Sequence, residues 1–161
     1  MINYDNCMVR RQDRLLDEAR AVELLQSGEY GFLAMASADG GYGVPINYVA
    51  DDDVIYLHCA TEGRKLRAIE NDERVSFVVV GKTELQPAEF TTYYESVVVM
   101  GRAHVVDDIE KRKLALNLLV RKYAPQHISA APKAIENSIH RTAVIAIKIE
   151  RLTGKRKQAK L

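Results

Sequence analysis

The alternation of apolar and polar residues predicts most of the strands in this chain. The segment VIYLHCA places Ile55, Leu57 and Cys59 on one face of a strand and Tyr56 and His58 on the other. The first face is expected to line a protein interior, so His58 is expected on the outer face. Similar alternation, or a dense run of β-branched residues, predicts five further strands, at 30–37, 42–50, 74–81, 93–106 and 142–152.

Apolar residues at helical spacing predict helices in four other segments, at 15–27, 61–71, 107–123 and 132–139. Gly28 is expected to end the first helix, and Thr61 is expected to cap the start of the second. Two acids, Asp107 and Asp108, favour the start of the third helix because they complement the helix dipole. Pro125 is expected to end that helix, because proline cannot continue it.

The order of these elements indicates the fold class. Turn signals at 38–41 and 51–53 join the first three strands into a predicted meander. The later helices lack βαβ alternation, which favours an α+β fold built on a six-stranded antiparallel barrel with flanking helices. We expect a single domain over residues 1–161, with loosely ordered ends at 1–9 and 156–161. Because small barrels fill their own interior, a ligand is expected at the rim or between subunits.

Composition and charge narrow the range of partners. The 161 residues are 47% hydrophobic and 28% charged, with a net charge near +1, so nothing draws the chain strongly to nucleic acid or membrane. No apolar run approaches the roughly 20 residues of a membrane helix, and the N-terminal residues lack the apolar segment of a signal peptide. The two cysteines, Cys7 and Cys59, lack metal-ligand spacing. We expect a cytoplasmic protein without a metal, nucleic-acid or membrane partner.

The residues that follow the VIYLHCA strand indicate a phosphate site. The second predicted helix begins here, and the N-terminus of a helix offers free N–H groups and a partial positive charge. Arg64 and Lys65 stand in its first turn, where the dipole disfavours cations, and Gly63 leaves the backbone open to a ligand. Free amides, a small residue and two cations together suit a phosphate monoester. The alternative is that Arg64 and Lys65 form an ordinary solvated helix face.

A proline in the middle of the second predicted strand gives another indication. Pro45 donates no hydrogen bond to a neighbouring strand, so this strand is expected to have an unpaired or bulged edge. Gly41 and Gly43 keep the same edge open. An open backbone edge can hydrogen-bond the rim of a planar heterocycle. The alternative is a simple edge strand that proline protects from aggregation.

Taken together, the segments resemble the FMN-binding split-barrel proteins related to pyridoxamine 5′-phosphate oxidase. They are most similar to the branch of nitroimidazole-resistance or flavin-nucleotide-binding proteins. The resemblance rests on the order and spacing of seven segments: RRQDR (10–14), VPINY (44–48), IYLHCATEGRK (55–65), NDERVSF (71–77), YESVVVMGRAHVV (94–106), DDIEKRKLALNLLVRKY (107–123) and TGK (153–155). It implies a homodimer of six-stranded antiparallel split β-barrels, with two FMN molecules in grooves between the subunits.

The resemblance also implies a set of site residues. The strand of the family that contacts the isoalloxazine ring corresponds to five consecutive residues, Val44, Pro45, Ile46, Asn47 and Tyr48. His58 and Cys59 would lie along the ring and the ribityl chain, and Ser96 falls where the oxidases place a polar contact to the flavin. The phosphate pair of the family corresponds to Arg64 and Lys65, the two residues that the chemistry of the helix N-terminus also selects.

Departures from the family affect the expected reaction. The pattern that binds a pyridoxine phosphate and the Arg-rich C-terminal strand are absent, so oxidation of pyridoxamine phosphate is not expected. We expect an FMN-dependent oxidoreductase that reduces small, electron-poor planar substrates such as nitroaromatics, with His58 as proton donor. The alternative is a module that holds FMN, haem or a deazaflavin without turnover, for storage or redox sensing. Tyr93 and Tyr94 either stack on the flavin or pack at the dimer interface.

Overall fold

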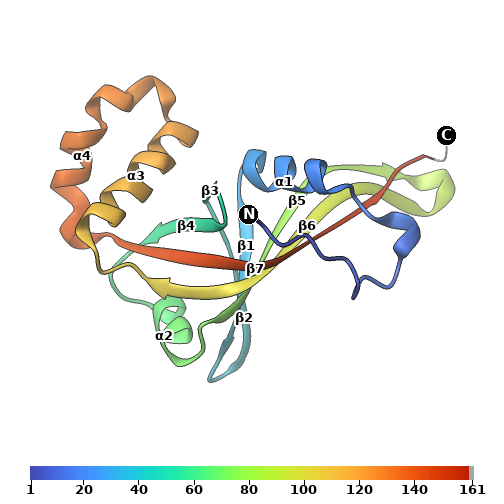
Figure 1. Ribbon diagram of the computed structural model, residues 1–161, viewed down its shortest axis with the longest axis horizontal. Helices are drawn as coiled ribbons and strands as arrows, with labels where there is room; N and C mark the ends of the chain where they lie inside the picture. Colours follow the sequence, from blue (N-terminus) through green and yellow to red (C-terminus); the bar gives the residue numbers. More distant parts are fainter. Residues whose placement is uncertain (160–161) are drawn as a thin grey trace.

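The computed structural model describes residues 1–159, and over this range the strands form one antiparallel sheet that curls strongly (Figure 1). The sheet has seven strands in the order β2–β1–β5–β6–β7–β4–β3. The strands are β1 (Gly31–Ser37), β2 (Gly40–Ile46), β3 (Val49–Asp51), β4 (Val54–Cys59), β5 (Arg74–Gln86), β6 (Thr91–Val105) and β7 (Ala143–Lys157). The helices are α1 (Glu18–Ser27), α2 (Arg64–Asn71), α3 (Ile109–Tyr123) and α4 (Ala131–Ser138), with short 3₁₀ helices at Gln12–Arg14, Pro87–Glu89, Pro125–Ala130 and Ile139–Arg141. The predicted α+β class and split-barrel architecture are confirmed.

One predicted strand, 42–50, is two strands, and this difference corrects the predicted meander. β2 and β3 do not pair with each other: the β1–β2 hairpin forms one edge of the sheet and the β3–β4 hairpin forms the other. The break falls at Tyr48, whose N–H donates to the hydroxyl oxygen of Tyr123 over 2.8 Å. The same hydroxyl lies 2.7 Å from the carbonyl oxygens of Tyr48 and Glu29. A side chain of α3 therefore replaces the strand partner that would have continued β2, and seven strands form where six were expected.

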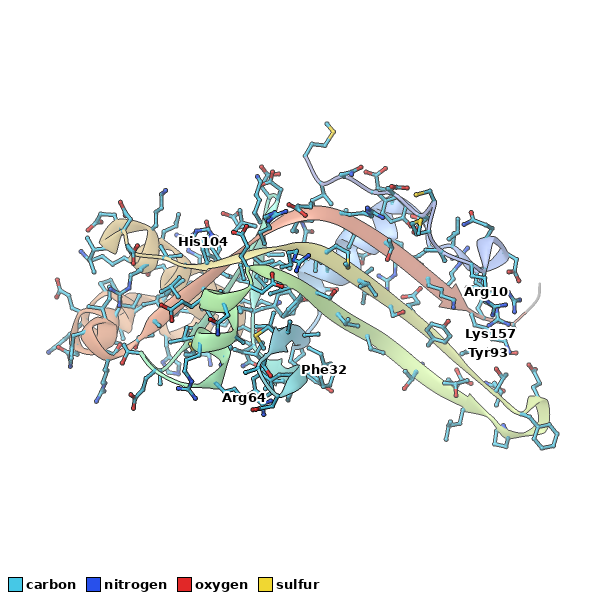
Figure 2. All side chains as sticks on the ribbon, turned by 90° about the horizontal axis from the view of Figure 1, so that it is seen from below. Arg10, Phe32, Arg64, Tyr93, His104 and Lys157 are labelled. Carbon is cyan, nitrogen blue, oxygen red and sulfur yellow. The ribbon has the colours of Figure 1, made fainter. Side chains whose placement is uncertain are left out.

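Three strands are longer than predicted. β5 runs to Gln86, β6 begins at Thr91 and β7 continues to Lys157, so that together they form an arm extending beyond the barrel (Figure 2). The pairing of β5 with β6 shifts register between Val80 and Thr83, close to where the arm leaves the barrel. Most arm side chains are exposed or half-buried. The apolar alternation that marks a strand in a sequence is therefore weak there.

The interior of the barrel is filled by its own side chains. The rings of Tyr48 and Phe77 meet edge to face with centroids 4.8 Å apart, and both side chains are fully buried. Other fully buried side chains around them are Leu25, Leu33, Ile55, Leu57, Val79, Val97, Val99, Ile145, Ile147 and Leu152. The interior is therefore full, and a ligand would have to bind at the rim or on the outer surface. This agrees with the expectation for a barrel of this size.

A second apolar cluster joins the helical hairpin α3–α4 to the outer face of the sheet (Figure 1). Val49, Val144 and Ala146 contribute from β3 and β7, and Leu119 and Ile135 contribute from the two helices. The hairpin thus covers the outer face of β3, β7 and β4, the last of which carries His58. No helix within residues 1–159 is long and apolar enough to cross a lipid bilayer.

Candidate functional site

The N-terminus of α2 lies directly after β4 and has no side-chain cap. The helix begins at Arg64, with Gly63 in the N-cap position at a backbone φ of 142°, a conformation that favours glycine. The prediction of Thr61 as the cap is therefore wrong, because the bend at Gly63 sets the start of the helix two residues later. Glycine offers no side-chain acceptor, so the first-turn N–H groups stay available to an anion.

The two predicted phosphate residues differ in their surroundings. The Arg64 guanidinium donates to the Ser37 hydroxyl over 3.0 Å, lies 3.6 Å from the Asp39 carboxylate and sits 4.3 Å from the centroid of the Tyr42 ring. All three partners belong to the β1–β2 hairpin. The Asp39 side chain is 83% exposed, so this ion pair is weak. Lys65 is half-buried and makes no ion pair within the described range.

The proposed ring strand is an edge, as Pro45 predicted. β2 pairs only with β1 among the described strands, and Pro45 lies opposite Phe32. Pro45 and Asn47 are exposed, whereas Val44 and Ile46 are half-buried and pack against the core. Tyr48 differs from the rest, because its ring is buried in the core and its hydroxyl donates to the carbonyl oxygen of Leu25. Since its N–H is also bonded, Tyr48 has little to offer a ligand.

His58 and Cys59 lie on opposite faces of β4, as the alternation predicted. Cys59 packs against the interior cluster, and burial raises the pKa of its thiol while Lys65 opposes the shift. His58 is on the outer face with part of its ring exposed. Neighbouring atoms still desolvate the ring enough to lower the pKa of His58, and the charge of Lys65 lowers it further. The imidazole is therefore neutral at pH 7, with one nitrogen able to donate and the other able to accept.

Ser96 lies apart from the other predicted contacts within one chain. It is half-buried on β6, paired with Val80 and Lys155 at the base of the arm. By contrast, His58 and Asn47 line one groove, and Lys65 lies close enough to His58 to influence its charge. Tyr93 is also remote: Figure 2 shows it beside Lys157 on the arm, far from Arg64, and its hydroxyl bonds the Glu89 carboxylate over 2.9 Å.

The outer face of β1, β5 and β6 carries apolar side chains in register. Phe32 pairs across the strands with Val78 and Val98, and Met100 stands in the next row of the same face. Phe32 is 43% exposed and Met100 is 46% exposed. Exposed apolar rows of this kind usually mark a contact surface. Ser96 lies on the same face of β6 as Val98 and Met100.

Sequence reasoning missed several residues that shape the site. Tyr123 fixes the bend at Tyr48, and Ser37 and Tyr42 hold Arg64. Their roles depend on contacts between distant segments, so spacing along the chain carries no signal for them. Among residues 1–159, no group of three His, Cys, Asp or Glu side chains is placed to hold a metal ion.

Comparison with known proteins identifies the class. Residues 17–156 match the family model described as pyridoxamine 5′-phosphate oxidase. The chain belongs to this family. No curated protein matches the sequence.

Solved structures share the fold. A protein from Bacteroides thetaiotaomicron described as a candidate 5-nitroimidazole antibiotic resistance protein is 22% identical, with a TM-score of 0.74 over 89% of this chain and 86% of that one. A FAD-binding protein from Mesorhizobium loti is 23% identical, with a TM-score of 0.65 over 90% and 98% of the two chains. A FAD and heme binding protein from Mycobacterium smegmatis is 17% identical, with a TM-score of 0.78 over 89% and 72%. At these identities the likeness establishes the fold alone.

Proposed function

We propose that the protein is a cytoplasmic flavoprotein that binds FMN between two subunits and uses it to reduce small, electron-poor planar molecules such as nitroaromatics. One observation carries the proposal: two cations, Arg64 and Lys65, stand in the first turn of a helix whose N-cap has no side-chain acceptor. Membership in the pyridoxamine 5′-phosphate oxidase family supports it. So does the fold shared with structures named for nitroimidazole resistance and for FAD binding.

The corner around Gly63 fits a phosphate monoester. A Cβ added at Gly63 would meet no atom within 4 Å, so an anion has room to approach the free amides. Lys65 has no carboxylate partner within residues 1–159, and the single carboxylate near Arg64 is well exposed. A doubly charged phosphate would compete successfully with Asp39, because it bonds guanidinium, ammonium and backbone N–H groups together.

The ring of the flavin would lie along the edge of β2. Pro45 and Asn47 present their outer sides there, and the edge has no neighbouring strand in the described chain. When bound, the flavin would supply the electron transfer. The chain's own residues would position the ring and hold a proton. His58, neutral at pH 7, would donate a hydrogen bond from its ring N–H to a polar atom of the substrate. The proton that a reduced substrate takes up would come from the protonated fraction of His58 or from solvent.

A homodimer completes this arrangement. The exposed rows around Phe32, Val98 and Met100 offer an apolar face that a second copy would cover. Ser96 lies on that face and not at the Arg64 corner, so Ser96 of the second subunit would approach the cofactor. We assign FMN and not FAD because a single phosphate monoester matches the corner formed by Arg64, Lys65 and the first-turn N–H groups of α2. The second candidate function is storage of flavin or redox sensing without turnover. An enzyme would let a nicotinamide donor reduce the bound flavin and would then consume nitrobenzene, with loss of its absorbance. A storage or sensing module would not consume nitrobenzene.

The phosphate assignment predicts which flavins lose affinity. Arg64→Ala combined with Lys65→Ala is expected to weaken FMN binding by at least about 100-fold, because two bonds to a charged group contribute about 1.5–3 kcal/mol each. Riboflavin, which lacks the phosphate, is expected to change by less than about threefold. Quenching of flavin fluorescence measures both. Lys111→Ala combined with Arg121→Ala removes the same charge from exposed positions on α3 and serves as control. Equal losses for FMN and riboflavin would contradict the assignment.

A further inference from the structure

A groove of about 340 Å³ opens between the end of β4 and the α3–α4 hairpin. It lies outside the barrel, and Leu116, Leu119 and Ile135 of the second apolar cluster form part of its wall. Its lining is mostly apolar, and the residues that form its helical wall are Leu116, Leu119, Val120, Tyr123, Ala134 and Ile135. A volume of this size accommodates a small organic molecule and is well above what one or two waters need.

Two polar side chains of the groove have unused hydrogen-bonding groups. Asn47 and His58 line it, and neither side chain forms a hydrogen bond with the part of the chain that the structure describes. The other three polar residues of the lining are satisfied internally. The Tyr123 hydroxyl is bonded to the backbone of Tyr48 and Glu29. Ser138 Oγ donates to the Ala134 carbonyl oxygen over 2.9 Å, and Thr142 Oγ1 donates to the Ser138 carbonyl oxygen over 2.9 Å. The groove therefore offers an amide and an imidazole at one place and apolar surface elsewhere.

The groove adjoins the edge where the flavin ring is proposed to lie. Asn47 also lines a second, shallow hollow formed with Tyr30, Phe32, Pro45 and Ile46. The two hollows thus meet at Asn47. A planar cofactor along Pro45 and Asn47 would have the groove beside it, with His58 within the groove.

The absence of charged residues from the lining favours an uncharged ligand. The residues that form the groove include no Asp, Glu, Lys or Arg, and His58 is its one titratable group besides Tyr123. A carboxylate placed there would be partly desolvated without a counter-charge among the lining residues, which is unfavourable. A neutral polar group, such as a nitro or carbonyl oxygen, would accept from Asn47 or His58 without that cost.

We infer that this groove is a binding site for an uncharged, planar and mostly apolar small molecule, with one polar group directed at Asn47 and His58. The inference that the bound molecule is a substrate rests on the proposed flavin function. The inference that the groove binds such a molecule does not depend on that function. Side chains of the α3–α4 hairpin form one wall of the groove and would limit the size of the molecule that binds.

Nitrobenzene and 4-nitrobenzoate are matched probes, because they differ by one carboxylate. Ligand-observed NMR on the flavin-free protein is expected to show nitrobenzene binding, with intermolecular NOEs to methyl groups of Leu116, Leu119 and Ile135. The carboxylate of 4-nitrobenzoate is expected to weaken binding by at least about tenfold, because no residue of the lining carries a counter-charge for it. Equal binding of both probes, or NOEs to other residues, would overturn the inference.

A groove-filling substitution provides a second test. Ala134 is exposed on α4 and lines the groove, so Ala134→Trp should fill it without disturbing the core. Nitrobenzene binding is expected to fall by at least about tenfold, whereas Lys133→Trp, one residue earlier and outside the lining, should leave it unchanged. Retained binding in Ala134→Trp would exclude this groove. Titration with FMN tests the flavin separately: binding of nitrobenzene without binding of FMN would reject the proposed function and leave the groove site standing.

Discussion

At the scale of single residues, Lys122 is one of two described side chains with a buried nitrogen that lacks a hydrogen-bond partner, the other being Arg112. Its ammonium is buried without a hydrogen-bond partner among the described residues, 3.8 Å from the centroid of the Tyr48 ring. Burial lowers the pKa of Lys122 from its ordinary value of 10.5 to about 8. The face of the Tyr48 ring attracts the ammonium and offsets part of this cost. At pH 7, below this pKa, Lys122 is still mostly charged, but the charged form is less strongly favoured than in solvent.

Lys122→Met is expected to raise the free energy of unfolding at pH 7 by about 1 kcal/mol, because a thioether needs no partner at this position. Between pH 8 and 10.5 the folded wild type binds fewer protons than the unfolded chain. Wild-type stability should therefore rise with pH in that window, and the advantage of the variant should shrink. Urea unfolding of both proteins at pH 7, 8, 9 and 10 measures the gap. A gap that stays constant across this range would mean that Lys122 does not titrate there.

At the scale of elements, the last turn of α3 shapes the predicted ring strand. Tyr123 bonds the backbone of Tyr48 from 75 positions away, and Lys122 covers the Tyr48 ring. The bend between β2 and β3 therefore depends on a helix that joins the fold much later in the sequence. Any cofactor positioned by Pro45 and Asn47 would depend on that helix in turn.

Tyr123→Phe is expected to lower the free energy of unfolding by about 2 kcal/mol, because the Tyr48 N–H and two carbonyl groups lose their partner. Hydrogen exchange at the Tyr48 amide should accelerate. If the bend positions the flavin, FMN and riboflavin should weaken in parallel, unlike in the Arg64 and Lys65 variant. Tyr56→Phe is the control, since Tyr56 packs in the same outer cluster and its hydroxyl bonds no residue within 1–159. A stable Tyr123→Phe protein with an unchanged Tyr48 amide would refute the role of Tyr123.

The same elements explain how far the sequence could be interpreted. Alternation in β4 correctly separated Ile55 and Leu57 from His58, and the helix predicted at 61–71 does form, although it begins at Arg64 and not after Thr61. Such features depend on neighbours in the chain. The break at Tyr48, the groove under α3–α4 and the arm depend on tertiary contacts or on exposed strands, neither of which leaves a periodic pattern.

At the scale of the whole molecule, the candidate site is complete only if a second copy covers the exposed apolar face of β1, β5 and β6. The α3–α4 hairpin covers β3, β4 and β7, but Phe32 and Met100 on the opposite part of the sheet stay exposed. Figure 2 shows Phe32 on the same side of the molecule as Arg64. A second copy seated on this face would therefore approach the phosphate corner. A stable dimer needs about 800 Å² of such surface from each partner.

Met100→Glu is expected to convert a dimer into a monomer, because a two-fold contact would bury the new carboxylates on an apolar surface. Ile128→Glu is a matched control, since Ile128 and Met100 are each 46% exposed but Ile128 lies in the 3₁₀ segment after α3. Light scattering after gel filtration should give a two-chain mass for the wild type and Ile128→Glu, and a one-chain mass for Met100→Glu. FMN affinity should fall together with the dimer, because Ser96 of the second subunit would be lost from the site. A monomeric Met100→Glu protein that still binds FMN with wild-type affinity would mean that one chain holds the cofactor alone, and Ser96 would then have no part in binding.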